Sequence, residues 1–209
     1  RRVAIKEYMP ASLAMRSGAQ DVVVTADKHL PVFTAGLDSF INEARLLAQF
    51  DHASLLKVYR FWRANGTAYM VMPYYEGMTL KERLRQAGTP PDERWLTTLI
   101  GSLTEALAVV HAEHCLHRDI APDNILLLAE SGRPQLLDFG AARQVIGDAT
   151  QALTAILKPG YAPVEQYADT PSLKQGPWTD IYALCAVVYA AVMGNKPPVS
   201  VGRTVVDGC

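Results

Sequence analysis

The chain has 209 residues, of which 49% are hydrophobic, and its formal net charge is −1. This length can bury one substantial core, or two small lobes that share a cleft. The near-neutral charge gives no reason to expect nucleic acid or an anionic membrane surface as a partner.

The cysteines and the longest apolar run bear on location. Cys115, Cys185 and Cys209 show neither a disulfide framework nor a metal-binding spacing, which is typical of a reducing compartment. The longest apolar run, residues 181–193, is shorter than the roughly 20 residues of a membrane span, so we expect a buried helix there. We therefore predict a cytoplasmic segment without membrane contact, which leaves open an anchor elsewhere in the parent protein.

The first predicted elements are a strand, an irregular stretch and a helix. Residues 3–6, VAIK, alternate with period two, as a strand does. Residues 7–37 are rich in turn formers, and we expect them to be irregular apart from a short β-like run at 22–24. Residues 38–50 carry an apolar stripe at helical spacing, which predicts a helix capped by its first aspartate or serine.

The middle of the chain predicts a hairpin followed by two helices. Residues 55–75 indicate two strands joined at Asn65-Gly66, a strong hairpin turn signal. A short helix at 79–87 has a capping box in its first turn and a glycine stop. A long amphipathic helix follows at 92–113.

The last part predicts a small hairpin, a long loop and a buried helix. Two short strands flank the turn at 131–134, residues 141–177 indicate a loop, and residues 179–193 a helix. The order of elements indicates an α+β chain in two lobes. We place a small, mainly β lobe at residues 1–75 and a mainly α lobe at residues 76–209. The boundary lies near Pro73 to Gly77.

Two charged residues lie where the pattern predicts partial burial. Glu43 is three residues after Phe40 and four before Leu47, so its carboxylate borders the apolar stripe of its helix. A carboxylate on that side needs a cation, and Lys6 on the predicted strand is a candidate. Alone, the two residues could equally be solvated charges on unrelated elements.

Three oxygen-bearing side chains stand at the ends of short aliphatic segments. Asp119, Asn124 and Asp138 could cap turns, and a lone Asp-x-x-x-x-Asn would be interpreted in that way. Carboxylate and amide oxygens also suit Mg²⁺, which uses few protein ligands and keeps waters and phosphates in its shell. The occurrence of Lys6 and Glu43 earlier in the same chain favours the second interpretation.

Together these residues resemble the signature of the eukaryotic-type protein kinase family. Residues 6–10, the long segment before the helix of Glu43, and residues 158–167 resemble a bacterial serine/threonine branch of that family. The motifs occur in the family's order over nearly the whole chain: Val3-Ala4-Ile5-Lys6, Glu43, His117-Arg118-Asp119 with Asn124, Asp138-Phe139-Gly140, and Ala162-Pro163-Val164-Glu165. The resemblance implies a two-lobed kinase fold and transfer of the ATP γ-phosphate to Ser/Thr hydroxyls of a protein substrate.

The resemblance also implies a role for each polar residue. Lys6 holds the α- and β-phosphates of ATP, and Glu43 orients Lys6. Asp138 binds the bridging Mg²⁺ and Asn124 the second Mg²⁺. Asp119 accepts the proton of the substrate hydroxyl.

An adenine pocket is implied in the same way. Met72 corresponds to the residue at its back, Pro73 supplies a carbonyl to the adenine amino group, and Tyr75 a backbone N–H to the ring. Ala4 above and Leu126 below enclose the adenine. Without the motifs, Ala4 and Leu126 would be interpreted as ordinary core residues.

Other positions match structural and regulatory features of the family. Asp180 corresponds to a buried aspartate that ties the buried helix to the turn at His117, and a stacked spine is formed by Leu47, Val58, His117 and Phe139. Arg118 corresponds to an arginine that pairs with a phosphate on the long loop. Thr150 and Thr154 are the candidate sites of autophosphorylation, unless both are plain loop residues.

The sequence departs from the family at one catalytic position. Serine/threonine kinases usually have a lysine two residues after the catalytic aspartate, where this chain has Ala121. Tyrosine kinases supply an arginine two residues later, where this chain has Asp123. A loop threonine of the family is replaced by Lys158. Because charge that develops on the phosphoryl oxygens needs a cation, we predict that Lys158 supplies it, unless it is a solvated loop lysine.

Two family elements do not occur within the 209 residues. The Gly-rich loop would precede Val3 and further helices would follow Met193, so we expect a kinase domain incomplete at both ends, poorly stable and weakly active alone. An arginine partner of Glu165 would lie among those helices, which leaves Glu165 a buried acid without it.

Two other functions stay open at this point. Ala121 favours a pseudokinase that serves as a nucleotide-binding scaffold, although Lys6, Asp119, Asn124 and Asp138 are intact. A small-molecule kinase of the aminoglycoside type shares the aspartate and asparagine spacing but lacks the later motifs.

Overall fold

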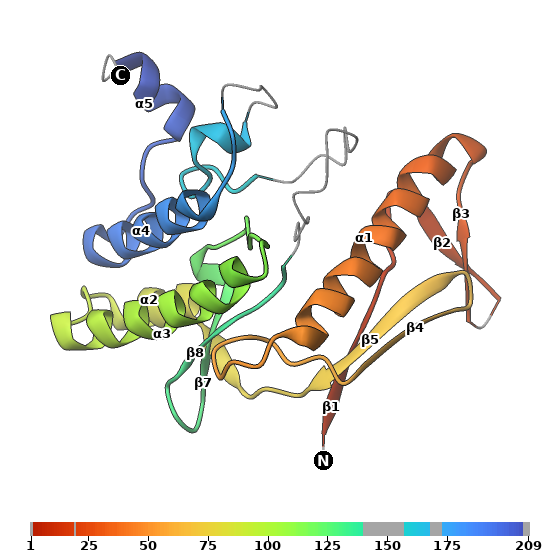
Figure 1. Ribbon diagram of the computed structural model, residues 1–209, viewed down its shortest axis with the longest axis horizontal. Coiled ribbons are helices and arrows are strands. Elements are labelled where there is room, and N and C mark those ends of the chain that lie inside the picture. The colour runs from red at the N-terminus through yellow and green to blue at the C-terminus, as the bar shows by residue number, and fades with distance from the viewer. Residues whose placement is uncertain (1, 19, 140–156, 168–172, 207–209) are drawn as a thin grey trace.

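The computed structural model describes residues 2–18, 20–139, 157–167 and 173–206. Figure 1 shows a sheet with one long helix on one side of the molecule and a mainly helical part on the other. The first sheet has the order β1-β5-β4, all antiparallel, and is formed by β1 (Val3–Glu7), β4 (Arg60–Ala64) and β5 (Thr67–Pro73).

The β4-β5 hairpin turns where the sequence predicts. Asn65 and Gly66 have φ angles of 54° and 70°, the left-handed conformation that an Asn-Gly hairpin turn requires. On the other edge of β5, Ala4 of β1 faces Met72 and Lys6 faces Met70. The period-two prediction for β1 therefore places Ala4 and Lys6 on one face, while Ile5 on the other is 62% exposed.

The prediction of an irregular stretch at residues 7–37 is wrong, although the β-like run expected at 22–24 does lie in a strand. This part forms a second, two-stranded sheet from β2 (Ala14–Ser17) and β3 (Asp21–Val24), then a short 3₁₀ turn at Asp27–His29, and then α1 (Leu30–Gln49). The predicted cap at residue 38 is wrong as well, because α1 begins at Leu30 with a proline in its first turn, and Asp38 pairs with Arg63.

Gly36, which favours a turn in the sequence, is instead a packing residue within α1. A Cβ atom at this position would lie 2.1 Å from the Tyr8 hydroxyl oxygen. Tyr8 also donates a hydrogen bond to the Phe33 carbonyl at 3.2 Å. The glycine therefore lets the segment after β1 pass close to the helix.

The third sheet lies where the two parts of the molecule meet. It consists of β6 (Gly77–Thr79), β7 (Ile125–Leu128) and β8 (Pro134–Leu136) in that order. The loop after α1 is joined to this sheet, because Leu136 N–H donates to Ser54 O at 2.9 Å and the Gln135 amide donates to Leu55 O at 2.9 Å. Asp138 comes two residues after the end of β8 and so lies near that junction.

The helices of the second part are α2 (Leu80–Ala87), α3 (Glu93–Ala112), α4 (Pro177–Met193) and α5 (Ser200–Val206). The predicted capping box of α2 is confirmed: Thr79 Oγ1 accepts from Glu82 N–H, and the Glu82 carboxylate accepts from Thr79 N–H. Within the predicted loop at 141–177, the described residues include a 3₁₀ turn at Val164–Gln166.

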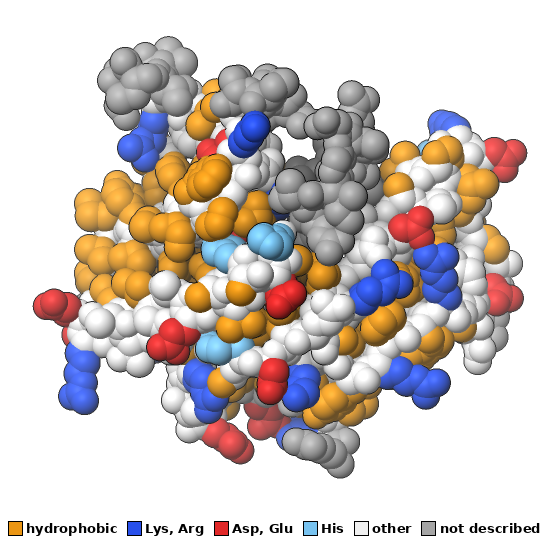
Figure 2. All heavy atoms as spheres, viewed as in Figure 1, with side chains coloured by type: hydrophobic (Ala, Val, Ile, Leu, Met, Phe, Trp, Pro, Cys, Tyr) orange, Lys and Arg blue, Asp and Glu red, His pale blue; other side chains and the backbone are white. Residues whose placement is uncertain are grey.

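One main core joins α1, α3, α4 and the sheets, and its fully buried members include Leu47, Met70, Leu103, Leu107 and Phe139. By length and composition, α3 alone among the described helices could cross a membrane. Five of its residues are buried, so one face is occupied by packing within the protein. α4 also exposes apolar side chains, which belong to the hydrophobic surface in Figure 2.

Candidate active site

The structure brings Lys6, Glu43 and Asp138 together from three elements. Lys6 Nζ on β1 lies 3.6 Å from Glu43 Oε1 on α1, so the predicted contact is present. Lys6 Nζ also forms a close ion pair with Asp138 Oδ1. One ammonium group is thus held between two carboxylates, one from each part of the molecule.

Burial governs the charges of this cluster. Burial raises the pKa of Glu43 to about 7, although the Lys6 charge acts in the opposite direction. Burial lowers the pKa of Lys6, but the Glu43 and Asp138 charges more than offset this and raise it above its ordinary value. Lys6 is therefore a fixed cation at neutral pH, while Glu43 is close to its titration point.

The loop after α3 places Asp119 and Asn124 side by side. Asn124 Nδ2 donates to Asp119 Oδ2 at 2.6 Å and to the Asp119 carbonyl at 2.9 Å, with the amide oriented by this network. The Asn124 carbonyl accepts from Leu137 N–H at 2.9 Å, which places Asp138 next to this loop. Residues far apart in sequence, Asp119, Asn124 and Asp138, thus meet in one site.

Asp180 anchors that loop to α4, as predicted. Its Oδ2 accepts from His117 N–H at 2.9 Å and its Oδ1 from Arg118 N–H at 2.8 Å. His111 of α3 contacts the same carboxylate at 2.7 Å. These bonds hold Arg118 at a φ of 64°, a left-handed conformation that is uncommon outside glycine and that turns Asp119 toward Asn124.

The predicted spine residues are all buried. The rings of His117 and Phe139 have their centroids 4.4 Å apart, and Leu47 and Val58 belong to the same core cluster as Phe139. Burial lowers the pKa of His117 to about 4 despite the nearby Asp180 carboxylate, so its ring is neutral at physiological pH. This packing holds Phe139, which follows Asp138, against His117, which lies two residues before Asp119.

Lys158 lies where the sequence predicted a replacement cation. Its Nζ is 3.5 Å from Asp119 Oδ1 and donates to Asp123 Oδ1 at 2.8 Å. Burial raises the pKa of Asp123, but the hydrogen bond and charge of Lys158 outweigh it and lower that pKa overall. Ala121, between the two aspartates, is buried and contributes no charge.

Asp123 is a site residue whose role the sequence interpretation missed. It stands where tyrosine kinases have an arginine, and the sequence predicts no role for it. The signal is that the sequence has a carboxylate in this loop and a lysine at the position of the family's loop threonine, and opposite charges at two positions of one site can pair. The structure shows the two as one ion pair.

The predicted adenine-pocket residues lie around the end of β5. Ala4 faces Met72 across the β1-β5 ladder, Pro73 ends β5, and Met72 and Tyr75 pack against the main core. Leu126 of β7 pairs with Thr79, and a Cβ atom at Gly77 would lie 3.3 Å from the Leu126 Cγ. That Ala4 and Leu126 enclose a base between them stays a prediction.

The donor set fits Mg²⁺ at this site. Asn124 uses its amide nitrogen toward Asp119, which leaves its Oδ1 for a cation, and Asp138 contributes a half-exposed carboxylate. No cluster of three or more His, Cys, Asp or Glu side chains that could hold a metal occurs in the described parts of the chain. Two oxygen donors suit a cation that keeps waters and phosphate oxygens as its other ligands.

Glu165 is a buried acid, as expected, and it has a hydrogen-bond partner among the described residues. Thr179 Oγ1 of α4 donates to Glu165 Oε1 at 2.9 Å, and both side chains are buried. This hydrogen bond from the start of α4 satisfies one oxygen of the buried carboxylate. Gly140, Thr150 and Thr154 lie outside the described residues, so their predicted roles stay predictions.

The two-part fold, the Lys6–Glu43–Asp138 cluster and the Asp119–Asn124 pair define a protein kinase domain. The family model described as the protein kinase domain matches residues 19–205, and the chain belongs to this family. This assigns it to the protein kinases and not to the aminoglycoside type.

Several relatives place the chain more narrowly. It is 32% identical over 168 residues to the serine/threonine-protein kinase PknA of Nostoc sp., covering 77% of this chain and 29% of that protein. It is 30% identical over 159 residues to PrkC of Bacillus subtilis, covering 76% and 24%. The solved structure titled "PpkA-294 apo form" is 49% identical with a TM-score of 0.84, covering 99% of this chain and 72% of that one. The chain thus spans less than a third of these two curated relatives.

Proposed function

We propose that this chain transfers the γ-phosphate of ATP, with Mg²⁺, to serine or threonine hydroxyls of proteins. The observation that carries the proposal is the convergence of Lys6, Asp119, Asn124 and Asp138 in one site. Its relatives from Nostoc, Myxococcus xanthus and Bacillus subtilis, which are serine/threonine-protein kinases, support the choice of hydroxyl and a role in bacterial signalling.

In this mechanism each residue holds a charge in place. Lys6, oriented by Glu43, binds the α- and β-phosphates, and Asp138 with Asn124 would hold Mg²⁺, which would neutralise charge on the phosphate oxygens. Asp119 orients the acceptor hydroxyl and takes its proton. The hydroxyl oxygen forms a bond to the γ-phosphorus, the bond from that phosphorus to the bridging oxygen breaks, and ADP leaves.

Lys158 supplies the cation that Ala121 lacks. Its Nζ, 3.5 Å from Asp119 Oδ1, lies beside the place where the acceptor oxygen and the γ-phosphate meet. Asp123 holds this ammonium in position by a hydrogen bond of 2.8 Å. The positive charge therefore comes from the later segment of the chain and not from the loop of Asp119.

The experiment is transfer of labelled γ-phosphate from Mg-ATP to a serine-containing protein acceptor. The Asp119→Asn variant keeps the side-chain size and removes the proton acceptor, so we expect a loss of about 10²-fold or more in kcat. Glu130→Gln, which changes an exposed carboxylate in the turn after β7, is the control and should leave transfer unchanged. Equal transfer by wild type and Asp119→Asn would refute the proposed chemistry.

We also propose a cytoplasmic site of action for this segment.

We further propose autophosphorylation at Thr150 or Thr154, with Arg118 as the partner of the phosphate. The support for autophosphorylation is the position of Arg118 directly before Asp119. Peptide mapping of label incorporated by the chain itself tests this, and label at neither threonine would contradict it.

A pseudokinase is the second candidate, and the buried Ala121 favours it. It predicts that Mg-ATP binds while no phosphate is transferred to any acceptor. Measured binding by calorimetry, beside the transfer assay, separates the two functions.

A further inference from the structure

Next to the site lies a cavity of about 560 Å³ between the end of α2, the end of α4 and the loop of Asp119. Pro122, three residues after Asp119, lines it, and so does Tyr161, whose N–H bonds to the Lys158 carbonyl at 3.0 Å. The cavity therefore begins where an acceptor hydroxyl would have to approach Asp119.

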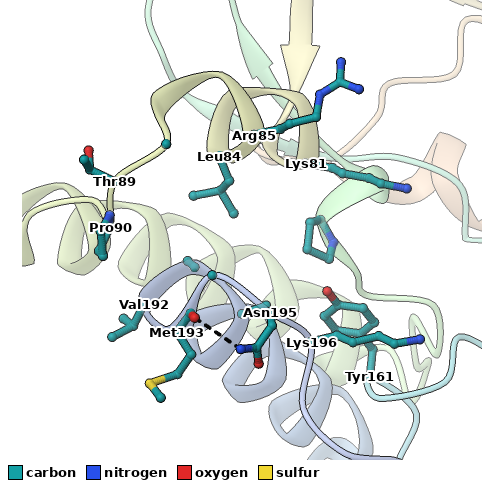
Figure 3. Close-up of a pocket in the computed structure, with 15 residues that line it drawn as sticks. Lys81, Leu84, Arg85, Thr89, Pro90, Tyr161, Val192, Met193, Asn195 and Lys196 are labelled. Carbon is teal, nitrogen blue, oxygen red and sulfur yellow. Dashed lines mark hydrogen bonds between the residues drawn. The ribbon is translucent and has the colours of Figure 1, made fainter.

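The charge of this cavity is one-sided. Lys81, Arg85 and Lys196 are among its described lining residues, and no aspartate or glutamate is. In Figure 3 the amines of Lys81 and Lys196 extend to the side of the cavity where Tyr161 lies, whereas the Arg85 guanidinium points away from it. Two lysines thus flank the end of the cavity that adjoins the catalytic loop.

The neighbouring carboxylates are occupied by other bonds. Asp123 accepts from Lys158, Glu82 caps α2 through Thr79, and Asp92 caps α3 by accepting from Trp95 N–H at 2.8 Å. Asp123 also interacts with the charge of Lys81. None of these three carboxylates lines the cavity, so its described lining carries only positive charge.

Helix stability does not explain both lysines. Lys81 lies in the first turn of α2, where the helix dipole disfavours a cation, while Lys196 follows the last residues of α4, where the dipole favours one. The two helix ends at the cavity, closed by Gly88 and Gly194, carry partial negative charge that would favour a basic ligand. Two full positive charges at the mouth outweigh those partial charges.

The rest of the cavity is apolar. Leu84 and Pro90 line one wall, and Val192 and Met193, which are 44% and 56% exposed, line the other. A chain of alternating acidic and apolar residues matches this surface better than a free anion does, because it contacts both parts.

We infer that this cavity selects the protein substrate by binding a segment that carries aspartate or glutamate next to the acceptor hydroxyl. The inference rests on the proposed function for the acceptor, and it names the substrate class as acidic polypeptide. Lys81 and Lys196 contact the carboxylates, and the apolar walls accept neighbouring side chains.

The test uses the full chain and labelled peptides that share one serine and differ only in flanking Glu, Ala or Lys residues. Binding is measured by fluorescence polarisation without nucleotide, and phosphate transfer is measured on the same peptides. We expect the Glu peptide to bind about tenfold or more tightly than the Lys peptide at low salt, with the difference shrinking as salt is added.

Charge reversal is the decisive variant. Lys81→Glu with Lys196→Glu should invert the order of the Glu and Lys peptides. Lys28→Glu, which changes an exposed lysine in the 3₁₀ turn before α1, should not. Equal binding of the Glu and Lys peptides, or an order unaffected by the double reversal, overturns the inference. Preferential binding of the Glu peptide with no phosphate transfer supports the cavity assignment and refutes the proposed kinase activity.

Discussion

At the scale of single residues, the two carboxylates that contact Lys6 differ in burial. Glu43 is buried with a pKa near 7, and its Oε1 has no hydrogen-bond partner among the described residues. Asp138 is half exposed and bonds to Lys6. Lys6 can therefore bind either carboxylate, and the pH decides how strongly Glu43 competes.

The raised pKa of Glu43 predicts how stability changes with pH. The folded chain holds the Glu43 proton more tightly than an unfolded chain with its ordinary value of 4.5, so its contribution is full below that value and is lost as pH rises toward 7. Glu43→Gln should remove this loss. The difference in unfolding free energy, variant minus wild type, should therefore rise by on the order of 2 to 3 kcal/mol from pH 4.5 to pH 8.

Urea unfolding of both proteins at pH 5, 6.5 and 8 measures that difference. Glu130→Gln is the matched control, since Glu130 is exposed, and it should track the wild type at every pH. Parallel stability curves for wild type and Glu43→Gln would show that Glu43 titrates as it does in the unfolded chain.

At the scale of elements, α1 depends on a contact outside itself. Replacing a glycine within a helix by alanine ordinarily stabilises the helix by about 1 kcal/mol. Gly36→Ala should instead destabilise the protein by roughly 1 to 3 kcal/mol, because the new methyl group meets the Tyr8 ring. Thermal unfolding measures this, and the loss should shrink when Tyr8→Phe removes the closest atom. A gain in stability for Gly36→Ala alone would contradict the packing described.

A comparison of α1 with three other elements shows what local sequence patterns can and cannot predict. The hairpin at Asn65-Gly66, the capping box of α2 and the long helix α3 were predicted closely, since each depends on neighbouring residues. The start of α1 was not, because Gly36 acts as a turn signal until Tyr8, 28 residues earlier in the sequence, is known to lie against it. Tertiary packing decided that element, and no local pattern contains it.

At the scale of the whole molecule, the motifs predicted which residues meet but not every pair. Lys6, Glu43 and Asp138 come together as the family resemblance implied. The Lys158–Asp123 and Glu165–Thr179 pairs were not predicted, because each depends on how the segment after Lys158 folds back on the loop of Asp119 and on α4. Such partners follow only from the three-dimensional path of the chain.

A nucleotide that contacts both parts of the molecule should stabilise it as a unit. Mg-ATP at about 100 times its Kd should raise the unfolding free energy by about 2.7 kcal/mol. Lys6→Met should abolish this gain, whereas Asp119→Asn should retain it, because Asp119 contacts the acceptor side of the site. Differential scanning fluorimetry gives the comparison, and an unchanged nucleotide-induced shift in Lys6→Met would place the nucleotide elsewhere.

The most direct measurement is the rate of γ-phosphate transfer by Lys158→Ala, with ATP affinity determined on the same samples. Because Lys158 lies 3.5 Å from Asp119 and replaces the charge missing at Ala121, kcat should fall by about 10²-fold while ATP binds as in wild type. Lys57→Ala, which removes an exposed lysine paired with Asp51, is the control and should transfer phosphate normally. An unchanged kcat in Lys158→Ala would show that the site works without the displaced cation, and would contradict the mechanism proposed.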